Sequence, residues 1–360
     1  MSDLEARSPG IIDWSIAFRL GRRIAGDDRS PLDEAAVRAT CEDALAKALA
    51  YTTLKPDAPV PDVEVVEREE WITANIAELS ALVVPMEERF AGELDLPGPF
   101  GPIARKGLGA TAGAEAGAVV GYAAKRVLGQ YVVSLRPDPA EPRMLLVGAN
   151  LEEAAGKLGV DPEAFLLWVS IHEQTHSIQF GSVPWLRDHI AGLVSQLLEA
   201  ASSGINIREV LARAKEMVTP DPRAGLRRIM GGELSRIFAS PEQAEVMDRV
   251  QAVMAVVEGY AEHVMDEASA GEPELELMRE RMDARRAQRT GLADMIARFL
   301  GLGQKLRQYE LGKRWCDAVV AEAGIEGLDR VWESAEALPS LEELEDAEAW
   351  IRRVLTPTPA

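Results

Sequence analysis

The chain has 360 residues, of which 39 are basic and 59 are acidic, so its formal net charge is −20. This length and an ordinary apolar content predict one large globular unit or two smaller ones with a substantial core. A surface this negative repels phosphate backbones and anionic lipid headgroups, so we expect neither nucleic acid nor a membrane surface as a partner.

Three features of the sequence bear on the cellular location of the protein: its N-terminal residues, its cysteines and one Gly-rich segment. The first residues lack a basic stretch followed by an apolar one, so no signal peptide is expected. Cys41 and Cys316 lie far apart and form no CxxC pair, which fits a reducing cytoplasm. The nearest approach to a membrane span is the Gly- and Ala-rich segment 107–128, which Glu115 interrupts. We interpret it as a closely packed helix, because its glycines do not fit the nucleotide-binding GxGxxG pattern.

Helical patterns dominate the first third of the chain. Pro-rich loops separate three amphipathic stretches, which predict helices around residues 13–23, 31–51 and 67–90. The strand signal follows, in two β-branched or apolar runs on either side of a turn-rich segment. Residues 130–135 and 143–148 are therefore predicted to form a hairpin or two neighbouring strands.

Two helices with clear start signals come next. Asp161 can cap a helix that has Pro162 at its first position and runs through Phe180. Ser240 begins a capping box with proline in the first turn, which predicts a helix to about Asp266.

The first of these helices contains the sequence His172-Glu173-Gln174-Thr175-His176, a HExxH. On a helix the two histidines lie one turn apart on the same face, so both imidazoles can reach one metal ion at about 2.0–2.1 Å. Glu173 is rotated by roughly 100° from His172, which places its carboxylate beside the metal. A general base at that place can take a proton from a metal-bound water. This pattern predicts a metal-dependent hydrolytic site.

The second helix supplies a third ligand. Catalytic zinc normally has three protein ligands and one open position. Glu258 emerges from an apolar run, where an ionised carboxylate needs a partner such as a metal ion. Glu262 follows one turn later, placed to accept the second N–H of a ligating histidine and fix its tautomer. The alternative interpretation is that both glutamates line a solvated stripe.

This combination is similar to the gluzincin metallopeptidases, whose third ligand sits in an Asn-Glu-Gly-Phe-Ala type of motif. Val257 replaces the asparagine here, and 82 residues separate His176 from Glu258, a longer gap than in that group. More closely, the chain resembles the zincin-like metallopeptidase type 2 family, whose members are largely uncharacterised, some being labelled as hydrolases or as associated with deazaflavin coenzyme biosynthesis. The resemblance spans most of the chain and is carried by Asp13-Trp14, the HExxH helix and residues 183–188, 258–266 and 305–312.

The resemblance implies a mainly α (α+β) fold with a zincin-like core, in which a small β-sheet lies beside the HExxH helix. The expected organisation is an N-terminal helical region over 1–129, a metal-binding core over 130–315 with a helical insertion at 182–240, and a C-terminal helical tail over 316–360. We expect these parts to form one compact unit.

The expected function is a cytoplasmic, Zn²⁺-dependent hydrolase with a peptide or amide substrate and Glu173 as general base. Tyr309 is the first candidate for a donor to the oxyanion, because it follows the third ligand as the donor tyrosine does in related aminopeptidases; His263 and Tyr260 are weaker candidates. One alternative is a non-catalytic zinc protein that serves as a protein-interaction module, and another is a metal-free helical module. Glu173 favours the enzyme, because a structural zinc site does not require it.

Overall fold

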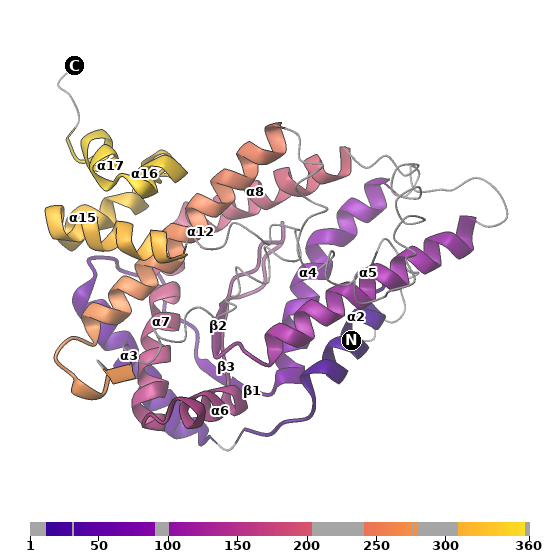
Figure 1. The fold of residues 1–360 in the computed structure, drawn as a ribbon, viewed down its shortest axis with the longest axis horizontal. Coiled ribbons are helices and arrows are strands. Elements are labelled where there is room, and N and C mark those ends of the chain that lie inside the picture. The colour runs from indigo at the N-terminus through magenta and orange to yellow at the C-terminus, as the bar shows by residue number, and fades with distance from the viewer. Residues whose placement is uncertain are drawn as a thin grey trace.

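A computed structural model describes residues 12–30, 32–90, 101–203, 241–275, 277–278 and 309–356. A small sheet lies in the middle of the molecule and helices cover both of its faces (Figure 1). This arrangement agrees with the mainly α fold and small sheet expected from the sequence. None of the helices in these ranges is long and apolar enough to cross a membrane.

The sheet has three strands in the order β1-β3-β2, and their bounds are Val63–Val66 for β1, Gly129–Val132 for β2 and Arg143–Val147 for β3. Strands β2 and β3 are antiparallel neighbours, as predicted. Strand β1 was not predicted. It has four residues beside a Pro-rich loop, and it exists by pairing in parallel with β3, where Val63 lies opposite Met144.

Both faces of β3 are buried. Met144 and Leu146 point into one hydrophobic core, and Leu145 and Val147 point into the other. A strand that is covered on both faces carries apolar residues at consecutive positions instead of alternating with polar ones. The sheet therefore separates two cores.

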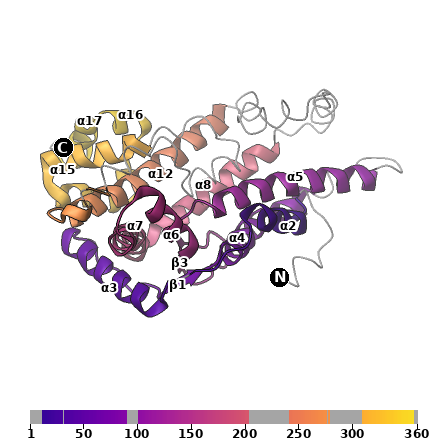
Figure 2. The ribbon, with the colours of Figure 1, turned by 60° about the horizontal axis from the view of Figure 1, so that its bottom comes forward.

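The core on one side of the sheet is formed with three helices of the N-terminal region: α2 (Trp14–Ala25), α4 (Arg68–Phe90) and α5 (Gly101–Ala124). Helices α2 and α5 lie side by side (Figure 2). A Cβ atom on Gly117 or Gly121 of α5 would overlap the α2 backbone, and one on Gly113 would overlap the carbonyl of Asp13, the residue that caps α2. The Gly- and Ala-rich segment is thus the closely packed helix that was expected.

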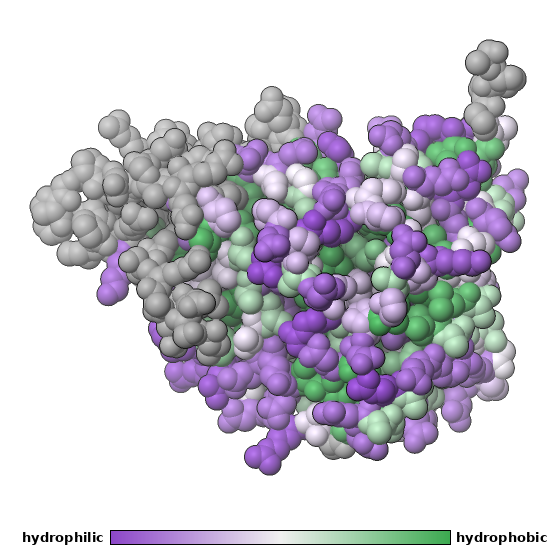
Figure 3. All heavy atoms as spheres, turned by 180° about the vertical axis from the view of Figure 1, so that it is seen from behind, coloured by the Kyte–Doolittle hydropathy of each residue, from purple (hydrophilic) through white to green (hydrophobic). Residues whose placement is uncertain are grey.

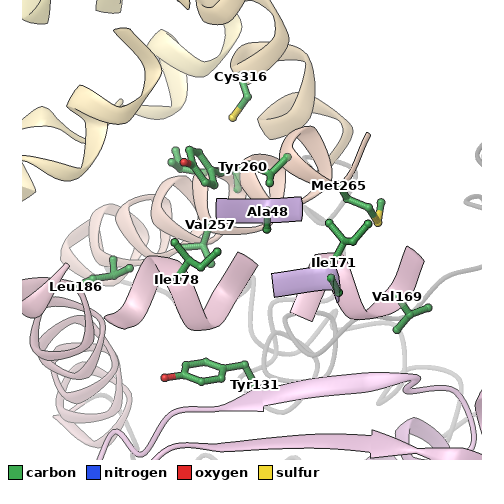
Figure 4. Packing of buried hydrophobic residues seen from close by; sticks show 14 of the residues in the cluster. Ala48, Tyr131, Val169, Ile171, Ile178, Leu186, Val257, Tyr260, Met265 and Cys316 are labelled. Atoms are coloured by element: carbon green, nitrogen blue, oxygen red, sulfur yellow. The ribbon is translucent and has the colours of Figure 1, made fainter. Parts of the chain in front are cut away.

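The core on the other side holds the remaining long helices, which are α3 (Glu34–Tyr51), α6 (Gly148–Leu158), α7 (Pro162–Ser182), α8 (Pro184–Ser203), α12 (Pro241–Ala268) and α15 (Tyr309–Asp329). Short C-terminal elements complete it: η3 (Arg330–Trp332), η4 (Ala335–Ala337), α16 (Leu341–Glu345) and α17 (Ala347–Val354). Figure 4 shows α7 between the sheet and α12, with Ile178 of α7 directed toward Val257 of α12.

Helix α7 begins as predicted. The Asp161 carboxylate accepts a hydrogen bond from the Ala164 N–H at 2.9 Å, and Pro162 occupies the first helical position, where no N–H is needed. Thirteen of its side chains are buried, so the helix that carries the HExxH sequence is a rigid core element. The predicted cap at Ser240 and residues 204–240 of the predicted insertion lie outside the described residues.

Candidate metal centre

Two histidines of α7 and one glutamate of α12 converge. The Nε2 atoms of His172 and His176 are 3.2 Å apart. Oε2 of Glu258 lies 3.6 Å from Nε2 of His172 and 3.9 Å from Nε2 of His176. These three residues are the one group of three or more His, Cys, Asp or Glu side chains in the described ranges whose ligand atoms lie close enough to share a metal ion.

The three separations suit a tetrahedral metal ion. Ligands at about 2.0–2.1 Å in a tetrahedron are about 3.3 Å from one another, and His₂Glu is a known catalytic zinc set. The three side chains keep some exposure to solvent, with 20% of His172, 11% of His176 and 20% of Glu258 exposed. The residues present therefore fit a zinc ion.

The tautomer of His176 follows from its neighbours. Gln179 donates through its Nε2 to the Val257 carbonyl at 3.0 Å, so its Oε1 is the atom that faces Nδ1 of His176 at 2.9 Å. Because Oε1 can only accept, Nδ1 carries the proton, and Nε2 presents a lone pair to the centre. A bound cation would give that lone pair a partner.

Glu173 lies on the sheet side of α7, with 8% of its surface exposed. Its Oε2 accepts a hydrogen bond from the Tyr131 N–H of β2 at 3.2 Å. A Cβ atom on Gly129 would lie 2.6 Å from Cγ of Glu173, so the side chain fits only because residue 129 has none. Strand β2 thus fixes where this carboxylate lies, next to the two histidines in sequence.

Helix α12 is held against α15 immediately beside Glu258. A Cβ atom on Gly259 would overlap the backbone of Gly312, and one on Gly312 would overlap the Ala255 carbonyl. The two helices therefore cross in backbone contact at these glycines. Because α15 begins at Tyr309, its first turn starts next to the helix that carries Glu258; the Tyr309 side chain is outside the described part.

The two weaker oxyanion candidates are engaged elsewhere. The Tyr260 hydroxyl is bonded to Thr52 at 2.5 Å and donates to Asp329 at 2.6 Å. His263 lies between the Tyr51 hydroxyl and the Asp317 carboxylate, at 2.7 Å from each.

Two features of the site were not predicted from the sequence. Gln179 follows His176 by three residues and so shares its helix face; this spacing was a signal for a partner of the imidazole, but the contact of Gln179 with α12 had none in the sequence. The contacts of Gly129 and Tyr131 with Glu173 join a strand to a helix more than 40 residues away. No local sequence pattern predicts such contacts.

Comparison with known proteins places the chain in a family. The sequence profile of a family described as zincin-like metallopeptidase matches residues 12–351. Among solved structures, the chain is similar to the crystal structure of a "putative hydrolase with a novel fold" from Chloroflexus aurantiacus, at 30% sequence identity and a TM-score of 0.72. The alignment covers 96% of this chain and 100% of that one. No curated protein gives a significant match.

Proposed function

This chain belongs to the zincin-like metallopeptidase family, and on that premise we propose that it is a zinc-dependent hydrolase that cleaves a peptide or amide bond. The observation that carries the proposal is the convergence of two imidazole nitrogens and one carboxylate oxygen from α7 and α12, at separations of 3.2, 3.6 and 3.9 Å. The family and the solved relative support a hydrolase; the metal, the bond and the roles below are our proposal.

Glu173 is proposed as the general base. His172, His176 and Glu258 would hold the zinc ion, which would supply Lewis acidity and lower the pKa of a water bound to it to about 7. Glu173 accepts the proton of the attacking water and returns it to the leaving group. Its burial and its hydrogen bond from the Tyr131 N–H support this role, because they hold the carboxylate in one orientation.

Two further residues are assigned roles around the same centre. We propose that Glu262 accepts the Nδ1–H of His172, because Gln179 already bonds Nδ1 of His176. Tyr309 is proposed to donate to the oxyanion. The crossing of α15 and α12 at Gly312 supports this assignment, since it brings the start of α15 to the helix of Glu258.

The test combines metal content with hydrolysis of a fluorogenic peptide mixture. Wild type is expected to bind one equivalent of zinc, and His172→Ala to lose it. Glu173→Gln is expected to retain zinc and to lose about 10²–10⁴-fold in hydrolysis. If the wild type binds a full equivalent of zinc but shows no hydrolysis, the protein is a non-catalytic zinc protein. If it binds no zinc at neutral pH, it is a metal-free module.

A further inference from the structure

The Gln179 side chain joins the two helices that carry the metal ligands. It is fully buried and lies on α7, three residues after His176. Its Oε1 is 2.9 Å from Nδ1 of His176, and its Nε2 donates to the Val257 carbonyl of α12 at 3.0 Å. The Gln179 amide thus forms hydrogen bonds with the proposed ligand His176 on α7 and with the Val257 backbone, directly before Glu258 on α12.

The first of these contacts sets the proton of the imidazole. The Val257 carbonyl can only accept a hydrogen bond. If the Gln179 amide were rotated by 180°, its oxygen would therefore face the Val257 carbonyl oxygen without a hydrogen between them. The orientation that remains requires the proton on Nδ1 and leaves the Nε2 lone pair of His176 directed at the centre. With the other tautomer, Nε2 would carry hydrogen and could not bind a metal ion until the proton moved.

The second contact sets the position of α12. Val257 and Glu258 belong to the same helical turn, which Gln179 holds from the α7 side. On the α15 side, the backbone contact between Gly259 and Gly312 limits how far that turn can retreat. Glu258 is therefore held within 4 Å of both imidazoles by contacts on both sides of its helix.

We propose that Gln179 is a positioning residue of the metal centre, which presets His176 as the Nδ1–H tautomer and holds Glu258 against the two imidazoles. This inference rests on the proposed function, because it takes the zinc site as its object. Partners of this kind contribute about 10–100-fold to metal affinity. Gln179 would act before any metal arrives, since both of its bonds are made within the protein.

The chain offers a matched control on the same helix. Gln174 is also buried, but its side-chain oxygen accepts a hydrogen bond from Ser177 one turn away on α7. An apolar substitution there removes a buried amide from the same helix, and the side-chain hydrogen bond that it removes stays within α7. A loss of zinc affinity specific to position 179 therefore measures positioning and not general damage to α7.

The experiment measures zinc affinity by competition with a chelator, together with the absorption spectrum of the cobalt-substituted protein. Gln179→Met is expected to bind zinc about 10–100-fold more weakly than wild type, with an altered cobalt spectrum, whereas Gln174→Met stays near wild type. Gln179→Glu keeps an acceptor for His176 but sets a carboxylate against the Val257 carbonyl, so it is expected to fall between. Equal affinities of Gln179→Met and Gln174→Met overturn the proposal.

A second measurement needs no substitution at position 179. The ¹⁵N spectrum of the metal-free wild type, with His176 assigned from the His176→Ala variant, is expected to show a protonated Nδ1 and an unprotonated Nε2. The opposite tautomer overturns the proposal even if Gln179→Met does not fold. A wild type that binds no zinc would instead refute the proposed function, so the two failures are distinguishable.

Discussion

Gly129 of β2 and Glu173 of α7 pack so closely that position 129 has no room for a side chain. The distance from a Cβ at residue 129 to Cγ of Glu173 would be 2.6 Å, which is shorter than real Cβ contacts. The neighbouring Tyr131 N–H bonds the same carboxylate. A strand of the sheet therefore determines the place of the proposed base, while the proposed metal ligands come from helices.

Gly129→Ala is expected to separate catalysis from metal binding. The added methyl group displaces Glu173, and a shift of about 1 Å in a reacting group can cost about 100-fold in rate. Zinc affinity should remain within a few-fold of wild type, because the atoms nearest to a Cβ at residue 129 belong to Glu173 and Leu146 and not to the proposed ligands. The measurement is kcat/KM together with zinc affinity. Gly156→Ala on α6, where a new Cβ meets nothing within 4 Å, is the control; equal activities of the two variants would refute this role of Gly129.

Zinc is expected to raise the free energy of unfolding. Because its proposed ligands come from two helices, α7 and α12, we expect the folded state to bind zinc and the unfolded chain to bind it only weakly. At free zinc 100-fold above Kd the gain is about 2.7 kcal/mol, seen as a higher Tm than in excess chelator. His172→Ala and Glu258→Ala should lose most of this increase. A zinc-dependent Tm that survives in both variants would mean that the metal binds elsewhere.

Gly312→Ala is expected to force α15 away from α12. Overpacking of a close contact costs about 1–3 kcal/mol of stability, and displacement of the Glu258 turn should also weaken zinc binding. Chemical denaturation and chelator competition measure the two effects. Gly192→Ala on α8 is the matched control, since its new Cβ meets nothing within 4 Å and alanine favours a helix by up to about 1 kcal/mol. Similar stabilities for the two variants would contradict the close crossing.

Asp317 should make part of the stability depend on acid pH. Burial alone would raise the pKa of this carboxyl, but hydrogen bonds from His263 and Lys313 outweigh burial and lower the pKa below its ordinary value of 3.8. Since the pKa is lower in the folded state, the stabilisation is complete above the unfolded pKa, near pH 4, and is lost as the pH falls through the folded pKa. The side chain is 43% exposed, so the effect is expected to be about 1 kcal/mol or less.

The comparison to make is with Asp317→Asn, by urea denaturation between pH 7 and pH 3. Asparagine keeps the shape but carries no charge, so the variant should be less stable than wild type at pH 7 and approach it in acid. If the free energies of unfolding of the two proteins run parallel over this pH range, the ionised form of Asp317 does not stabilise the fold.

What could be predicted from the sequence is local. The HExxH spacing, the Asp161 cap and the apolar run before Glu258 each lie within a few turns of one helix, and the structure brings the three expected ligands together. The proposed roles of Glu173, Glu262 and Tyr309 remain predictions. For Tyr309, the structure adds the position of its helix.

What could not be predicted depends on contacts between distant segments. Strand β1 is a strand because β3, about 80 residues later, pairs with it. Gln179 looks like one more buried polar residue until α12 brings the Val257 carbonyl to its amide. Gly129 and Gly312 are important because the absence of a side chain lets Glu173 and the α12 backbone, respectively, come close. A single sequence does not show which neighbour approaches a glycine.

The sheet also acts as a partition. His172, His176 and Glu258 lie on helices of one core, whereas α2, α4 and α5 build the other core beyond β3. Repacking of the far core can therefore proceed during evolution without moving a ligand, provided that the three strands keep their register. Sequence constraint should therefore be distributed unevenly, with slower change around the proposed metal site and faster change in the far core.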